Sequence, residues 1–104
     1  MSVVNLGEVY YRVYRETGLA WSERALIWAE SLPINFVDAD RTLTLDAAQI
    51  KARYALSYAD CFAAALARQL NASIVTGDEE FRTLQDQGVV DVEWIAAKPR
   101  TSRR

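Results

Sequence analysis

Apolar side chains recur at helical spacing along four stretches of this chain. The pattern predicts helices over Ser2–Thr17, Ala20–Leu32, about Thr42–Tyr54, and from Ser57 to about Leu70. Gly18 and Pro33 lie where the first two helices should stop. Ser22 and Ser57 are possible amino-terminal caps for the second and fourth helices.

Short apolar runs separate the later helices. They predict a short helix at Glu79–Gln85 and strands at Ile34–Val37, Ser73–Val75 and Val89–Val92. Strands that alternate with helices are typical of a parallel sheet, so the predicted fold class is α/β. Ligands bind such sheets beyond the carboxyl ends of the strands, and Asp38 and Asp78 lie at two of these ends.

Asp60 interrupts the most apolar helix of the pattern. From Tyr58 to Leu70 nearly every residue is apolar apart from Asp60, Arg68 and Gln69, which places this helix inside the domain. Burying a bare carboxylate is very costly, so Asp60 needs hydrogen bonds, a cation or a metal. The residues alone leave two interpretations open, a capping role beside Ser57 or a metal ligand.

The other acidic residues also have structural explanations. Asp78 is a possible N-cap of the helix that starts at Glu79, and that role can coexist with metal binding. Glu8 can form an i,i+4 ion pair with Arg12. Glu79 and Glu80 both suit the first turn of a helix, and Glu80 is a reserve candidate for a ligand.

Composition and charge limit the class of protein. The chain has 104 residues, enough for one domain with a modest core, and 51% of them are hydrophobic, which excludes wholesale disorder. Residues 1–97 hold eight basic against fourteen acidic side chains, a net charge of −6, so broad phosphate-driven binding is disfavoured. We expect residues 98–104 to form a flexible basic tail.

The chain has neither a long apolar run nor a secretory leader. The absence of both predicts a cytoplasmic protein with no membrane segment. The single cysteine, Cys61, is expected to be a small core residue in a reducing compartment.

Two later motifs resemble those of PIN-domain ribonucleases, in particular the VapC-like toxins of toxin–antitoxin modules. Leu56–Ala65 resembles the helix that carries the family's third acid, here Asp60. Thr76–Phe81 resembles the strand-end motif that carries the fourth acid, here Asp78.

An upstream motif extends the resemblance over most of the chain, from Ser2 to Trp94. Ser2–Val9 resembles the helix start that bears the family's second acid, Glu8. The resemblance implies a PIN-like parallel sheet flanked by helices, and metal-dependent endonucleolytic cleavage of RNA. Glu8, Asp60 and Asp78 would be the catalytic residues and the ligands of Mg²⁺ or Mn²⁺, hard cations that take oxygen ligands. The implied partners are an RNA substrate, a cognate antitoxin protein and further copies of the chain in a homo-oligomer.

One feature departs from the family pattern. The family begins with an apolar strand that ends in its first acid, and no aspartate or glutamate precedes Glu8. We therefore expect a partial PIN-like domain over residues 1–97, truncated at the N-terminus, whose activity depends on whether three acids suffice. The alternative is a non-catalytic PIN remnant that acts as a dimer- or antitoxin-binding module. The aromatic side chains of the first two helices are expected to be core or interface material: Tyr10, Tyr14, Trp21 and Trp28.

Overall fold

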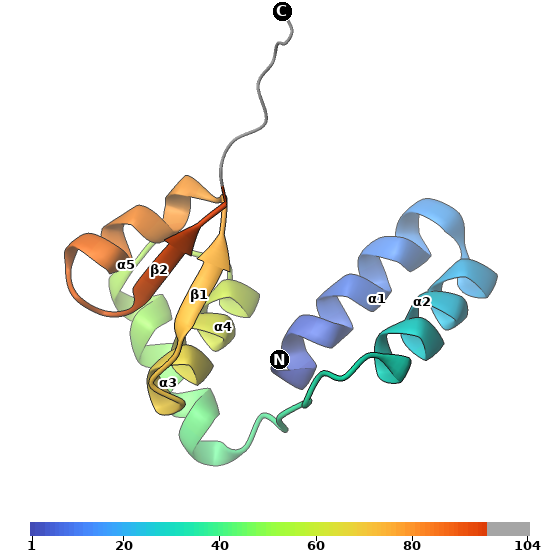
Figure 1. The fold of residues 1–104 in the computed structure, drawn as a ribbon, viewed down its shortest axis with the longest axis horizontal. Coiled ribbons are helices and arrows are strands. Elements are labelled where there is room, and N and C mark those ends of the chain that lie inside the picture. Colours follow the sequence, from blue (N-terminus) through green and yellow to red (C-terminus); the bar gives the residue numbers. More distant parts are fainter. Residues whose placement is uncertain (96–104) are drawn as a thin grey trace, which may run out of the picture.

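The structure, a computed structural model, describes residues 1–95 and shows an α/β protein (Figure 1). The predicted basic tail, residues 98–104, lies outside the described residues. The elements follow the chain in this order: α1 (Val3–Thr17), α2 (Leu19–Ser31), α3 (Arg41–Arg53), α4 (Tyr58–Gln69), β1 (Ser73–Thr76), the 3-10 helix η1 (Glu79–Phe81), α5 (Arg82–Asp86) and β2 (Asp91–Trp94).

Local signals in the sequence set the helix ends. The side chain of Ser2 caps α1 by accepting a hydrogen bond from the Val4 N–H at 3.1 Å. Gly18 ends α1 with φ +90°, a backbone conformation that favours glycine, and its N–H bonds to the Tyr14 carbonyl at 2.8 Å. The predicted cap at Ser22 is wrong, because α2 begins three residues earlier and the buried Ser22 hydroxyl donates to the Leu19 carbonyl at 2.8 Å.

The sheet has two parallel strands. β1 pairs with β2 in a register that runs from Ser73 opposite Asp91 to Thr76 opposite Trp94. β2 therefore begins two residues after the predicted start at Val89. The reason is local, because the Val89 N–H bonds back to the Leu84 carbonyl at 2.8 Å and holds that residue in the preceding turn.

The strand predicted at Ile34–Val37 does not form as a strand. Within residues 1–95, the strand pairing of this segment is limited to an isolated parallel bridge between Val37 and Ser2. The Val3 N–H donates to the Val37 carbonyl at 2.9 Å, and the Val37 N–H donates to the Met1 carbonyl at 2.8 Å. The pairing stops there because the chain enters α1 at Val3, which removes the partner backbone.

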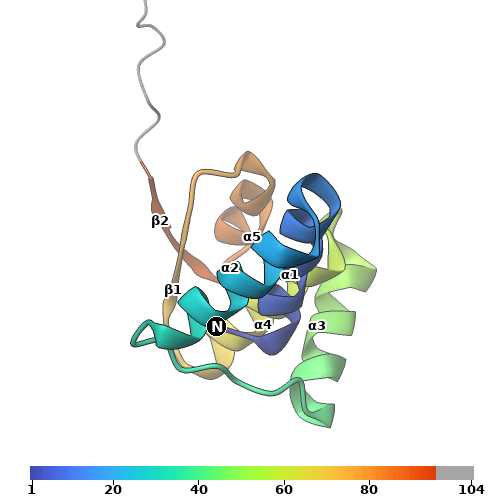
Figure 2. The same cartoon turned by 90° about the vertical axis from the view of Figure 1, so that its right-hand side faces the viewer.

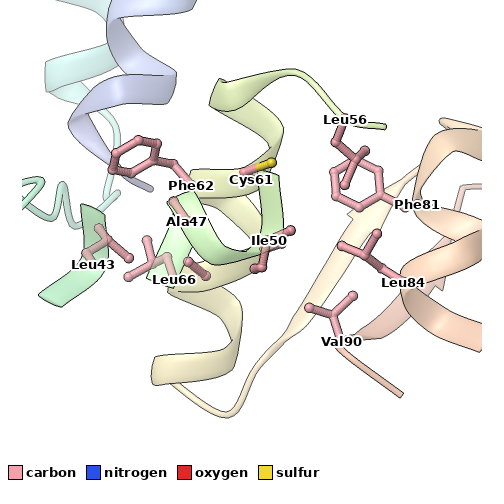
Figure 3. Close-up of a cluster of buried hydrophobic side chains, with 12 residues drawn as sticks. Leu43, Ala47, Ile50, Leu56, Cys61, Phe62, Leu66, Phe81, Leu84 and Val90 are labelled. Atoms are coloured by element: carbon pink, nitrogen blue, oxygen red, sulfur yellow. The ribbon is translucent and has the colours of Figure 1, made fainter. Parts of the chain in front are cut away.

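The hydrophobic core lies among α3, α4, η1, α5 and the sheet (Figure 3). Cys61 is fully buried within it, and this burial raises the pKa of its thiol, as suits a core residue. The core consists of twelve buried side chains: Leu43, Ala47, Ile50, Leu56, Cys61, Phe62, Ala64, Ala65, Leu66, Phe81, Leu84 and Val90.

The helices α1 and α2 pack on each other as a hairpin at one side of this core (Figures 1 and 2). No residue of α1 is buried, and Ser22 is the only buried residue of α2. Trp21 and Trp28 are 58% and 65% exposed, so they do not belong to the core. Among residues 1–95, no helix has both the length and the apolar character needed to cross a bilayer.

Candidate metal centre

Three carboxylates meet beyond the carboxyl end of β1. Asp60 comes from the first turn of α4, Asp78 follows β1, and Glu80 lies in η1. Each can offer one oxygen atom so that the three oxygens lie within 4.8 Å of one another. Asp60 is half-buried and the other two are exposed, so the cluster lies on an open edge of the protein.

The cap of α4 fixes the position of Asp60. The Ser57 hydroxyl accepts a hydrogen bond from the Asp60 N–H at 3.1 Å, and the side-chain amide of Asn5 donates to the Ala59 carbonyl at 2.9 Å. Ser57 therefore acts as the cap, while the Asp60 carboxylate accepts no hydrogen bond from any described residue. A half-buried carboxylate without such a bond is free to bind a cation.

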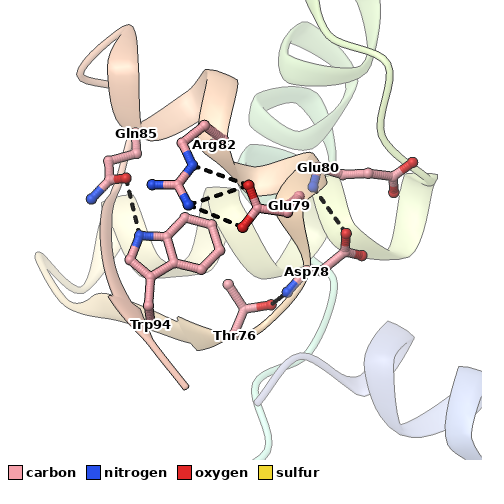
Figure 4. Close-up of polar contacts among 7 residues, drawn as sticks. All are labelled: Thr76, Asp78, Glu79, Glu80, Arg82, Gln85 and Trp94. Carbon is pink, nitrogen blue, oxygen red and sulfur yellow. Dashed lines mark hydrogen bonds and ion pairs between the residues drawn. The ribbon is translucent and has the colours of Figure 1, made fainter. Parts of the chain in front are cut away.

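Asp78 has a capping role that leaves part of its carboxylate available (Figure 4). Its Oδ1 accepts a hydrogen bond from the Glu80 N–H at 2.9 Å, and its own N–H donates to Thr76 Oγ1 at 3.0 Å. These two bonds fix the Asp78 backbone and side chain in the turn after β1. The second oxygen, Oδ2, remains free for a ligand, so the capping role and a metal role are compatible.

Neighbouring contacts decide which of the two glutamates joins the cluster. Glu79 forms an ion pair with Arg82, with an Nη2–Oε2 distance of 3.0 Å, and this interaction raises the pKa of Arg82. The Arg82 guanidinium also lies over the Trp94 ring, 4.3 Å from its centroid. Figure 4 shows Glu79 turned toward Arg82, on the side of η1 away from Asp78 and Glu80. The reserve candidate Glu80 is therefore the glutamate beside the two aspartates.

Glu8 lies outside this three-carboxylate group and is paired with Arg12 on α1. The Arg12 Nη2–Glu8 Oε2 distance is 3.7 Å, which matches the i,i+4 pair expected from the sequence. The pKa of Arg12 is raised, first by a hydrogen bond with Tyr11, then by the charge of Glu8 and, to a smaller extent, by that of Asp60. The charge of Asp60 therefore acts weakly on Arg12, whose nearest acidic partner is Glu8 on the same helix.

The donor set fits a hard divalent cation. Two oxygens bound to one Mg²⁺ at about 2.1 Å lie roughly 3.0–4.2 Å apart in octahedral geometry. The observed spacing within 4.8 Å needs only a small contraction to reach that range. Carboxylate oxygens are the ligands that Mg²⁺ and Mn²⁺ prefer, and an exposed site leaves room for bound water.

Fold and site together define an α/β protein with an acidic cluster at the carboxyl end of a parallel strand. The sequence profile of the PIN domain matches residues 1–87 of this chain. The chain therefore belongs to the PIN domain family. Comparison with curated proteins and with solved structures gave no significant match. A PIN domain implies a nucleic-acid substrate, and PIN domains generally use a divalent metal, which agrees with the chemistry of the cluster.

Proposed function

We propose that this protein is a metal-dependent endoribonuclease, the toxin of a toxin–antitoxin module, in which Asp60, Asp78 and Glu80 hold Mg²⁺ or Mn²⁺. The observation that supports this most is the convergence of three carboxylates at the strand end in a PIN-family chain. In this proposal Glu8 is not a ligand of the metal ion. It lies on α1, which contacts α4, and its role is to direct a water molecule or an RNA group toward the cluster.

The residues of the site are oriented by contacts within the protein. Ser57 holds the first turn of α4 and so positions Asp60, while Thr76 holds the turn that carries Asp78. A divalent ion bound there would lower the pKa of a bound water and neutralise charge on the phosphodiester. Because the carboxylates are placed before an ion binds, little ordering would be needed when it does.

The exposed apolar side of the α1–α2 hairpin supports the proposal that a protein partner binds there. Trp28 and Ile27 are 65% and 68% exposed, and large exposed apolar patches commonly mark interaction sites. A shallow apolar hollow of about 330 Å³ lies on this side, lined by Val13, Thr17, Trp21, Arg24, Ala25 and Trp28. We assign this side to contact with the antitoxin or with a second copy of the chain. The assignment is the same for a ribonuclease toxin and for a non-catalytic binding module.

Incubation of the purified chain with a structured RNA tests the proposal. We expect cleavage in millimolar Mg²⁺ or Mn²⁺ and none in EDTA, because the carboxylates need a cation to act on a phosphodiester. Cleavage is read by gel electrophoresis of an end-labelled RNA. RNA that stays intact at every metal concentration would instead favour the non-catalytic binding module, whose support is the exposed hairpin.

Replacing Arg12 by glutamine is expected to tighten metal binding. Arg12 places a positive charge near Glu8 and Asp60, and a bound divalent ion would be repelled by it. We expect the Kd for Mn²⁺ to fall by about two- to fivefold, the modest size that suits an exposed charge in salt. Mn²⁺ titration followed by electron paramagnetic resonance measures it.

Arg15→Gln is the matched control for this change. Arg15 is on the same helix but lies over the Tyr11 ring, 5.5 Å from its centroid, and no carboxylate contributes to its described contacts. It should leave the Kd unchanged, and raised salt should shrink the effect of Arg12→Gln. Equal effects of the two substitutions would show that Arg12 has no special influence on the cluster.

A further inference from the structure

The Arg82 side chain is held in a fixed orientation by two neighbours. Its Nε and Nη2 atoms donate to Glu79 Oε1 at 3.3 and 3.2 Å, and Nη2 also donates to Glu79 Oε2 at 3.0 Å. One face of the guanidinium lies on the Trp94 ring, whose own N–H donates to Gln85 Oε1 at 3.1 Å (Figure 4). An arginine side chain has much rotamer freedom to lose, and here these contacts fix it before any ligand binds.

These contacts leave one edge of the guanidinium open. Glu79 takes the edge formed by Nε and Nη2, whereas Nη1 donates to no residue in the range 1–95. A guanidinium carries five N–H donors in a planar fork, so the two donors on Nη1 remain available to a ligand. The side chain of Arg82 is 48% exposed, and a ligand can therefore reach it. Such a fork of charged donors suits a phosphate group.

Arg82 lies close to the candidate metal centre along the chain. It is the first residue of α5 and follows Glu80 of η1 by two positions, so the two residues lie within one helical turn. Figure 4 shows the Arg82 guanidinium and the Glu80 carboxylate on opposite sides of this segment. A nucleic-acid strand carries a phosphate at every nucleotide. Arg82 is thus placed to meet a different phosphate from the one at the carboxylates.

We propose that Arg82 binds a phosphate of the RNA strand that neighbours the scissile one, through its Nη1 edge, while Glu79 and Trp94 hold it in position. The identity of the ligand as RNA rests on the proposed function. Glu79 reduces the net charge at this point, so Arg82 acts as an oriented donor and not as a source of long-range attraction. An oriented contact is what an acidic chain needs, because its overall charge repels the strand.

Binding of a short single-stranded RNA to the full chain tests the proposal without nuclease activity. The fluorescent RNA is titrated in EDTA at low salt, where no cleavage is expected and charge contacts are least screened. Arg82→Gln should raise the Kd about three- to tenfold. Arg68→Gln is the matched control, because it makes the same change in the last turn of α4, whereas Asp60 lies in the first turn. It should change the Kd less than about twofold.

Cleavage in Mn²⁺ then locates the contact. Arg82→Gln should raise KM by a similar factor and leave kcat and the Kd for Mn²⁺ within about twofold. One methylphosphonate beside the cleaved bond should raise KM for the wild-type chain but have no further effect on Arg82→Gln, because the contact is already lost. A side chain that only fixes the end of β2 would not give this position-specific coupling.

A measurement on the wild-type chain makes the test independent of how the variant folds. The NMR resonance of the Arg82 Nε–H should shift when the RNA is added, since Nε belongs to the same planar group as Nη1. An unshifted resonance, or equal RNA affinity of wild type and Arg82→Gln, would overturn this proposal and leave the nuclease function standing. RNA that binds through Arg82 but is never cleaved would support the contact and overturn the nuclease function. A wild-type chain that binds no RNA would overturn both.

Discussion

Asp60→Asn is expected to remove metal-dependent RNA cleavage from this protein. Asparagine keeps the shape of the side chain and leaves the Ser57 cap in place, but it removes the half-buried charge of the cluster. Loss of groups that merely support a metal ligand already costs 10–100-fold, so loss of a ligand should reduce the cleavage rate by more than about 100-fold. Cleavage of an end-labelled RNA at saturating Mn²⁺ measures the rate.

A second measurement separates a lost ligand from a damaged fold. Mn²⁺ at ten times its Kd should stabilise the wild-type chain by about 1.4 kcal/mol, because it binds only the native state. Asp60→Asn should lose this response without lowering the melting temperature of the metal-free protein. Asp46→Asn makes the same chemical change on α3, outside the cluster, and should behave like wild type. Full activity in Asp60→Asn would show that the cluster is not the catalytic site.

Leu84→Ala is expected to give the largest loss of stability. Leu84 is fully buried on α5, within the cluster of core side chains shown in Figure 3. Truncation of a buried leucine removes its apolar contacts and leaves a cavity, which costs about 2–5 kcal/mol. For a domain of this size, that is a large part of the whole free energy of unfolding, which equilibrium urea denaturation measures.

Leu19→Ala is the matched control, because it makes the same substitution on the α1–α2 hairpin. Leu19 is 54% exposed, so the free energy of unfolding should change by less than about 0.5 kcal/mol. A loss at this position equal to that at Leu84 would mean that the hairpin is buried in solution, against another copy or against the core.

Helices could be predicted well from this sequence because their signals are local. Gly18 stops α1 and Ser57 caps α4 as expected, since each acts through backbone atoms within four residues of itself. The strands were harder to predict, because pairing depends on distant partners. Val37 meets only Ser2, and nothing in the run Ile34–Val37 itself indicates that its partner segment turns into a helix.

For the candidate site too, local signals could be predicted from the sequence and the packing of distant elements could not. The nearness of Asp60 and Asp78 followed from the family motifs and from the strand end, and the structure brings their carboxylates together. The choice between Glu79 and Glu80 had one local signal, the Arg82 three residues after Glu79 that pairs with it. The place of Glu8 could not be predicted from spacing, because it depends on how α1 packs against α4. The role of Glu8, Asp60 and Asp78 as ligands remains a prediction.

The way in which α1 is attached affects how the site can come apart. Segments with few buried contacts open at lower free energy than the core, and α1 has no buried residue. Among residues 1–95, one hydrogen bond joins α1 to α4, from the Asn5 side chain to the Ala59 carbonyl, and Val4 packs at the margin of the core. An excursion that detached the hairpin would carry away Glu8 and Arg12 while Asp60, Asp78 and Glu80 stayed on the core elements. If Arg12 opposes the ion, that partly opened conformer has the higher metal affinity, and rising metal concentration would increase its population. Metal supply and hairpin mobility would then be thermodynamically linked in one small chain.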